Sequence, residues 1–254
     1  MIPADIGKGG ARKGAPFFYV PTQDVVGKHR GKRGVVIASG PSLSDFDFSL
    51  LTQDDLITIA VNEEGHRIKD RHIPDYWIFN DATFTDRLLD NGYLPHEDTQ
   101  LVISSAVVGW LSARHATLPE TKHPPIMYSP RAQFDPDDPI RYALRRTTST
   151  AAISHLFLTG IRDIWLGGVD LCYLLDQSYY HDGHPQRMPL KADKLNSVQV
   201  SDGIWCTQKN LDMMTDVTIL VKSLGDANTS ITQGCLHSPL DCCEKKDFKD
   251  WYGR

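Results

Sequence analysis

The chain has 254 residues, of which 41% are hydrophobic and 23% are charged. This length and composition suit one large α/β domain, or one domain with an appended lid, and they exclude a disordered chain or a small disulfide-stapled scaffold. A formal net charge of -5 gives no general polycationic surface, so tight non-specific nucleic-acid binding is not implied and a small-molecule partner is expected.

The sequence predicts neither a membrane segment nor a secretion signal. No apolar run approaches the roughly 18 to 20 residues that span a bilayer, and residues 1–5 have no signal-peptide core. The five cysteines are an odd number in a chain too long to need stapling, which predicts reduced thiols. Cys235-x-His237 followed by Cys242-Cys243 fits no usual zinc spacing, so ordinary thiols are predicted in preference to a metal site. These features predict a cytoplasmic protein.

Residues 1–33 are rich in Gly, Lys and Arg and show no amphipathic period, which predicts a flexible basic leader. Residues 34–254 are expected to form a single domain. Its first strand is predicted over Val35–Ala38, because a short Val/Ile run is typical of a buried parallel strand. The run ends in Ser39-Gly40-Pro41-Ser42, a turn of small residues that lets phosphates approach backbone amides closely.

Further short apolar runs predict buried strands over Ile57–Val61, Tyr76–Phe79, Leu101–Ser104 and Ile164–Leu166. Strands that alternate with helical connections are typical of a parallel sheet. The expected fold is therefore α/β and Rossmann-like, with a mostly parallel sheet flanked by helices.

Two helices are predicted in the second half of the chain. Thr148–Thr159 has hydroxyl residues in front of a broad apolar face, and another helix begins near Thr207. Residues 172–206, between them, are polar and have little periodicity. A loop of that length in a compact domain is usually functional or disordered, and here we expect a lid over the ligand.

Polar residues directly after the predicted strands are candidate ligand contacts, because open parallel sheets bind ligands beyond the carboxyl ends of their strands. Besides the turn at Gly40, these residues are Asn62, Asn80, Asp81 and Asp170. An asparagine amide both donates and accepts hydrogen bonds, as a base or ribose requires. Taken singly, Asn62, Asn80 and Asp81 are better explained as turn-forming residues. Asp170 is a candidate for a ribose hydroxyl, a metal ion or a structural cap.

The start of the first predicted helix is a candidate phosphate site. It reads Arg145-Arg146-Thr147-Thr148-Ser149-Thr150. A helix N-terminus offers free backbone amides and the positive end of the helix dipole. Capping accounts for one hydroxyl, whereas four in succession after two arginines favour phosphate binding.

Taken in order, these segments resemble two related groups of proteins. The Gly40-Pro41-Ser42-Leu43 turn, the strand ending in Asn62, the Thr148-Ser149 pair and the run from Gly160 to Leu171 are similar to the bacterial sialyltransferases of glycosyltransferase family 42. They also resemble the 6-hydroxymethylpterin diphosphokinase-like family, which has a Rossmann-like core. The likeness covers about residues 34 to 235.

The resemblance to the sialyltransferases implies specific roles. It implies that the cytidine nucleotide of the donor is held by Gly40, Ser42, Asn62, Thr148 and Ser149. Pro41 belongs to the same turn and is a further candidate contact, and the expected donor is a CMP- or UDP-sugar. It also implies a histidine general base in the polar segment, with tyrosines that stabilise the departing phosphate. The segment offers Tyr180, His181 and His184, and His181 is favoured as the base because Tyr179 and Tyr180 precede it.

Three functions remain open. The favoured one is a glycosyltransferase that moves a sugar from a nucleotide donor to a hydroxyl acceptor without a metal. The second is a diphosphokinase that uses ATP and magnesium, with Asp81 and Asp170 as metal ligands. The third is a non-catalytic nucleotide-binding module. The sequence specifies neither the sugar nor the acceptor, and it leaves open whether the chain forms a homo-oligomer.

Overall fold

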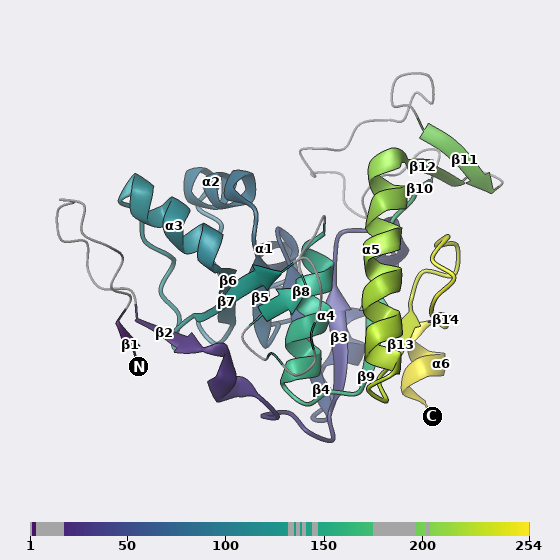
Figure 1. The fold of residues 1–254 in the computed structure, drawn as a ribbon, viewed down its shortest axis with the longest axis horizontal. Helices are drawn as coiled ribbons and strands as arrows, with labels where there is room; N and C mark the ends of the chain where they lie inside the picture. Colours follow the sequence, from purple (N-terminus) through teal and green to yellow (C-terminus); the bar gives the residue numbers. More distant parts are fainter. Residues whose placement is uncertain are drawn as a thin grey trace.

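A computed structural model describes residues 2–3, 18–131, 135, 138, 141–143, 147–174, 197–201 and 204–253. They form an α/β fold in which a twisted central sheet is covered by helices on both faces (Figure 1). This confirms the predicted fold class.

The central sheet is built from strands spread along the whole described chain. They are β1 (Ile2–Pro3), β2 (Phe18–Pro21), β3 (Arg33–Ile37), β4 (Leu56–Val61), β5 (Tyr76–Phe79), β6 (Gln100–Ser104), β7 (Ile126–Arg131), β8 (Arg141–Ala143), β9 (Asp163–Gly167), β13 (Ser230–Gln233) and β14 (Glu244–Lys245). Their order is β1-β2-β7-β6-β5-β4-β3-β9-β13-β14, with β8 beside β7. Among the described strands of this sheet, β1 and β2 pair antiparallel and every other pairing is parallel. The strand predictions are confirmed to within two residues at each end.

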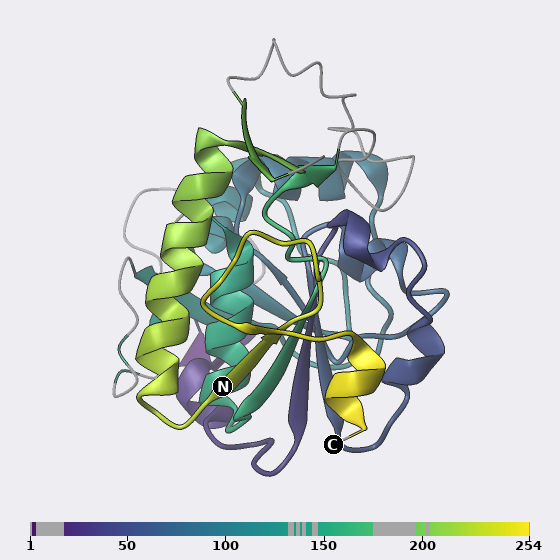
Figure 2. The same ribbon diagram turned by 90° about the vertical axis from the view of Figure 1, so that its right-hand side faces the viewer.

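Helices cover both faces of the sheet. They are α1 (Glu64–Arg67), α2 (Ala82–Asn91), α3 (Ser105–Arg114), α4 (Thr148–Leu158), α5 (Gln208–Gly225), α6 (Phe248–Tyr252) and the 3-10 helices η1 (Thr22–Val25), η2 (Pro41–Leu43) and η3 (Phe48–Leu51). Figure 2 shows α4 and α5 side by side over one face, with α6 over the other. The starts of α4 and α5 confirm both helix predictions. In the described part of the chain, no helix combines the length and the apolarity that a membrane span requires.

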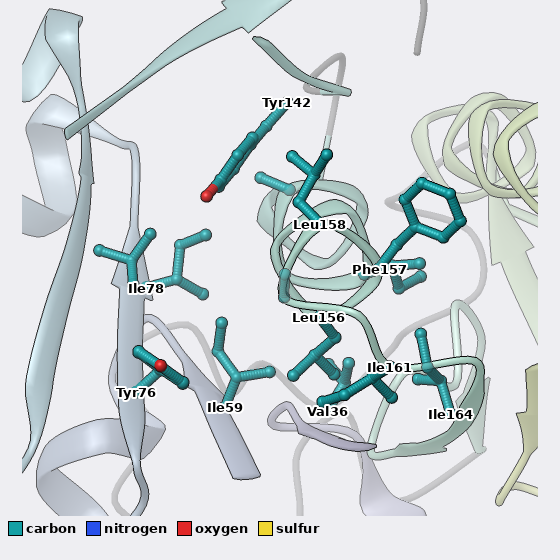
Figure 3. Close-up of a cluster of buried hydrophobic side chains, with 14 of the residues drawn as sticks. Val36, Ile59, Tyr76, Ile78, Tyr142, Leu156, Phe157, Leu158, Ile161 and Ile164 are labelled. Atoms are coloured by element: carbon teal, nitrogen blue, oxygen red, sulfur yellow. The ribbon is translucent and has the colours of Figure 1, made fainter. Parts of the chain in front are cut away.

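The core consists of two layers, one on each face of the sheet. Alternate residues of a strand point to opposite faces. Val36 and Ile59 therefore pack under Leu156 of α4 (Figure 3). Val35 packs with Trp165 on the other face. Strands buried on both faces read as continuous apolar runs. That is why short runs were sufficient to locate them.

The predicted leader extends too far. Part of it, residues 18–33, packs against the fold: β2 pairs with β7 through Val20 and Ile126, and Val25 is buried in the core. The backbone N–H of His29 also donates to the carbonyl of Thr159 at 2.6 Å. The apolar contacts of this segment are few and lie among basic and glycine residues, so no amphipathic period reveals them.

A second, small sheet is formed by the two ends of the predicted lid. It comprises β10 (Tyr173–Leu174), β12 (Ile204–Thr207) and β11 (Ser197–Ser201), paired antiparallel in that order. It lies beside the start of α5 (Figure 1). Residues 175–196, which contain Tyr180, His181 and His184, lie outside the described residues, so the lid and its catalytic residues remain predictions.

Candidate functional site

A cavity of about 220 Å³ opens at the carboxyl edge of the central sheet. From β3 the chain adds β4 to β7 in one direction, and it then returns to place β9 on the other side of β3. Open α/β sheets bind their ligands at such a reversal of strand order. The described lining comes from the loops after β3, β4 and β9 and from the starts of α4 and α5: Ala38, Ser39, Gly40, Val61, Asn62, Thr147, Ser149, Gly168, Val169, Asp170, Leu171, Cys172, Lys209, Asn210 and Met213.

Hydrogen bonds join the loop after β3 to the loop after β9. The N–H of Gly40 donates to the carbonyl of Gly168 at 2.8 Å. The Asp170 carboxylate accepts from the N–H of Ser42 at 2.8 Å and from its hydroxyl at 2.6 Å. Asp170 is 2% exposed, and burial raises the pKa of its carboxyl, while the bonds from Ser42 act in the opposite direction. Both Asp170 oxygens therefore hold the turn at Ser42.

Glycine is required at position 40 by this close approach of the two loops. A Cβ on Gly40 would lie 2.5 Å from Asp170 Cγ and 2.5 Å from the carbonyl oxygen of Gly168. Gly168 has φ of 68°, and Leu171 has φ of 55°, a left-handed conformation that non-glycine residues adopt rarely. The wall between β3 and β9 is thus compact, and part of its backbone is strained.

Asn62, directly after β4, lines the cavity and carries a buried hydrogen-bond acceptor that has no partner among the described residues. Its φ is 54°, also left-handed. Its backbone N–H donates to Ile78, and its carbonyl accepts from the indole N–H of Trp77. The side-chain Oδ1 is buried and has no hydrogen-bond partner among the described residues. Strained backbone and orphaned polar atoms are typical of ligand sites, because the ligand supplies the missing partner.

Two helices begin at the cavity. Thr147 caps α4, and its hydroxyl accepts from the N–H of Ser149 at 3.3 Å. Thr207 caps α5 in a reciprocal arrangement with Asn210. The first N–H groups of a helix have no partner within the helix and carry partial positive charge. Lys209, exposed in the first turn of α5, makes no ion pair with any residue that the structure describes. This wall suits an anion.

The structure brings four of the predicted contacts into the cavity lining: Gly40, Asn62, Ser149 and Asp170. The other predicted contacts lie nearby but outside that lining. Pro41 and Thr148 are buried, and Ser42 is bonded to Asp170. Their contact with a ligand stays a prediction.

The two residues predicted after β5 also lie outside the described lining. The Oδ1 of Asn80 is buried and has no hydrogen-bond partner in the described chain. Asp81 lies at the start of α2, where its carboxylate accepts from the N–H of Phe84 at 3.4 Å and its carbonyl accepts from Thr85. Asp81 therefore acts as a helix cap, a role that the sequence analysis did not assign to it.

Sequence reasoning missed the contribution of α5 to the cavity. Lys209, Asn210 and Met213 line it, but none of them was among the predicted ligand contacts. The Thr207-x-x-Asn210 pattern indicates where a helix begins and nothing about which edge of the sheet it faces. No group of three or more His, Cys, Asp or Glu in the described chain is arranged to hold a metal ion.

No protein-family model matches the chain, and no curated protein matches it in sequence. Among solved structures, the MAf glycosyltransferase from Magnetospirillum magneticum AMB-1 matches with a TM-score of 0.57 and 15% identity, over 90% of this chain and 37% of that chain. The sialyltransferase CstII from Campylobacter jejuni, in complex with CMP-3FNeuAc, matches with a TM-score of 0.44 and 14% identity, over 84% of this chain and 86% of that one. The α-2,3-sialyltransferase Cst-I from the same organism matches with a TM-score of 0.43 and 13% identity, over 82% of this chain and 78% of that chain.

The MAf match shows a shared Rossmann-like fold. This chain spans little more than a third of the length of that protein, because the match covers 37% of it. The predicted resemblance to the diphosphokinase-like family finds no support among these matches.

Proposed function

We propose that the protein is a glycosyltransferase that moves a sugar from a CMP- or UDP-sugar donor to a hydroxyl acceptor. The observation that carries this proposal is the unpartnered Oδ1 of Asn62 in a cavity where two helices begin. One wall offers a buried acceptor for a base or ribose, and another offers N–H donors and a lysine for phosphate. The fold shared with a protein named a glycosyltransferase supports the same class of reaction.

In this proposal the nucleoside lies against the end of β4 and the phosphate lies at α4 and α5. A ribose hydroxyl or an exocyclic amine donates to Asn62 Oδ1. The phosphate accepts from the first-turn N–H groups near Ser149 and from the ammonium of Lys209. Because the nucleotide phosphate gains negative charge as the sugar departs, these donors stabilise the leaving group more than the ground state.

The acceptor hydroxyl must lose its proton as it attacks the sugar. A neutral imidazole, with an unperturbed pKa of about 6.5, takes up such a proton at neutral pH. His181 is the favoured base and His184 the alternative, with the hydroxyl of Tyr180 on the departing phosphate. This part of the proposal depends on the sequence alone.

A magnesium-dependent diphosphokinase receives less support from the described geometry. Its two metal-ligand candidates are otherwise engaged: both carboxylate oxygens of Asp170 accept from Ser42, and Asp81 caps α2 outside the cavity lining. Magnesium dependence therefore separates the two enzyme hypotheses.

The test is a thermal-shift panel of CMP, UDP, GDP and ATP, each with and without magnesium. A ligand at about one hundred times its Kd stabilises a protein by about 2.7 kcal/mol. We expect stabilisation by CMP or UDP without magnesium, and about half of that stabilisation in Asn62→Gly at the same ligand concentration. Release of CMP or UDP from a sugar donor, with and without candidate acceptors, then tests transfer. Stabilisation by ATP that requires magnesium would favour the diphosphokinase, and a panel with no shift would refute the nucleotide site.

A further inference from the structure

The five cysteines fall into two environments. Cys172, Cys206 and Cys235 are buried, with exposed fractions of 5%, 0% and 5%. Burial raises the pKa of Cys206 to about 11, which keeps it protonated and unreactive. Cys242 and Cys243, in contrast, are neighbours in the chain, half-buried and free, and their Sγ atoms lie 3.6 Å apart.

The surroundings of the pair make its two thiols unequal. Hydrogen bonds from the Cys243 thiol and the Thr218 hydroxyl, together with the positive charge of Lys222, lower the pKa of Cys242 to about 7, against the effect of burial. The same hydrogen bond and burial raise the pKa of Cys243. Thr218 and Lys222 both belong to α5. The second nearby lysine, Lys245, is paired with Asp241 at 3.2 Å. Cys242 is thus the more acidic thiol of the pair, and it ionises before Cys243 does.

We propose that Cys242 and Cys243 form a reversible thiol-modification site that reacts with low-molecular-weight disulfides. The Cys242 thiolate attacks one sulfur of the small disulfide, whose S–S bond breaks. A mixed disulfide forms on Cys242, and one small thiolate leaves and takes up a proton. The Cys243 thiol then loses its proton and attacks the Cys242 sulfur, which expels the second small thiolate. The two cysteines lose two electrons and two protons in total, and the small disulfide gains both.

The adjacency of the two residues explains why this modification is reversible. Cα atoms joined by a trans peptide are about 3.8 Å apart, closer than the roughly 4.4–6.8 Å of most disulfides. A disulfide outside that range stores strain and is more easily reduced. A partly exposed thiolate with a resolving thiol beside it is the usual arrangement of a redox-responsive cysteine. The site therefore suits a switchable modification and not a permanent cross-link.

The experiment treats the reduced full-length protein with oxidised glutathione and maps the modified cysteines by mass spectrometry. We expect the peptide with Cys242 and Cys243 to lose two hydrogen atoms while Cys172, Cys206 and Cys235 stay reduced. Cys243→Ser is expected to accumulate glutathione on Cys242, because the resolving thiol is gone. Cys242→Ser is expected to remain unmodified, and dithiothreitol is expected to restore the wild type.

Modification that falls first on a buried cysteine, or a wild-type pair that stays reduced, would overturn the proposal. So would a folded Cys243→Ser protein that gains no glutathione. If a serine variant does not fold, the peptide map of the wild type alone decides the matter. Lys222→Gln is expected to slow the reaction more than Lys245→Gln, because Lys245 is already paired with Asp241.

Discussion

The loops after β3 and β9 and the loops after β4 and β5 lie at the same edge of the sheet. They differ in whether their polar groups are hydrogen-bonded within the protein. In the first pair, Gly40 bonds to Gly168 and Ser42 bonds to Asp170, so the side-chain donors and acceptors at the contact are used within the protein. In the second pair, Asn62 and Asn80 each bury an Oδ1 with no hydrogen-bond partner in the described chain.

This difference separates groups that build the site from groups that are available to a ligand. A hydrogen bond to a charged group contributes about 1.5–3 kcal/mol, whereas a buried unsatisfied acceptor costs about 1–3 kcal/mol. The contact between β3 and β9 therefore stabilises the empty protein, and Asn62 destabilises it. A group that costs stability in the empty protein is a stronger candidate for ligand binding than one that is already satisfied.

The largest expected effect comes from Gly40→Ala, which breaks the bonded pair of loops. The added Cβ would meet Asp170 and Gly168 at 2.5 Å, so we expect the free energy of unfolding to fall by about 1–3 kcal/mol or more, with loss of nucleotide binding. Urea unfolding measures this effect. Gly109→Ala is the control, because a Cβ there meets nothing within 4 Å and the helix gains about 0.5–1 kcal/mol. Equal effects of the two changes would contradict the role of the loop contact.

Asp170→Asn tests the same contact through pH. Burial raises the pKa of Asp170, so the folded protein binds this proton more tightly than the unfolded chain does. The contribution of Asp170 to stability is therefore fully present below the ordinary value of 3.8 and falls as the pH rises through the raised folded-state pKa. We expect the stability advantage of the wild type over Asp170→Asn to shrink as the pH rises across this window, as measured by urea unfolding at several pH values. An advantage that grows with pH would contradict the assigned shift.

Asn62→Gly tests whether the unpartnered acceptor after β4 binds the nucleotide. Glycine tolerates the left-handed backbone and removes the orphaned acceptor, so the empty protein is expected to be as stable as the wild type or more stable. Nucleotide affinity is expected to fall about tenfold, or about 1.4 kcal/mol, in a calorimetric titration. Asn228→Gly is the matched control, because Asn228 has φ of 55° and lies outside the cavity lining. Unchanged affinity in Asn62→Gly would remove Asn62 from the site.

Lys209→Gln is expected to have the smallest effect. A cation near the phosphate contributes about 0.3–1 kcal/mol at an exposed position, so nucleotide affinity should fall about two- to fivefold at low salt. The loss should disappear in about 1 M salt, where the screening length is about 3 Å. Lys222→Gln, near the other end of α5, should leave affinity unchanged at both salt concentrations. A loss of nucleotide affinity in Lys209→Gln that is the same at both salt concentrations would instead indicate a structural role for Lys209.

The sequence was sufficient to predict the main strands and helices, and the site residues that directly follow the strands. A residue placed after a parallel strand must lie at the ligand edge, so Gly40, Asn62 and Asp170 could be predicted from position alone. The position of Lys209 in the cavity could not be predicted in this way, because Lys209 follows no strand of the central sheet. Its position depends on where α5 begins relative to that sheet. The bond between Ser42 and Asp170 was also beyond local patterns, since it joins positions 128 apart.

That separation of 128 positions also has a consequence for biosynthesis. β3 is made well before β9, and one of its long edges stays unpaired until β9 has been made. Until then that edge carries unpaired backbone groups able to pair with a strand of another molecule. The candidate cavity at the junction of β3 and β9 forms only after β9 has been made. Truncated chains that stop before Asp163 lack it and keep the unpaired edge of β3.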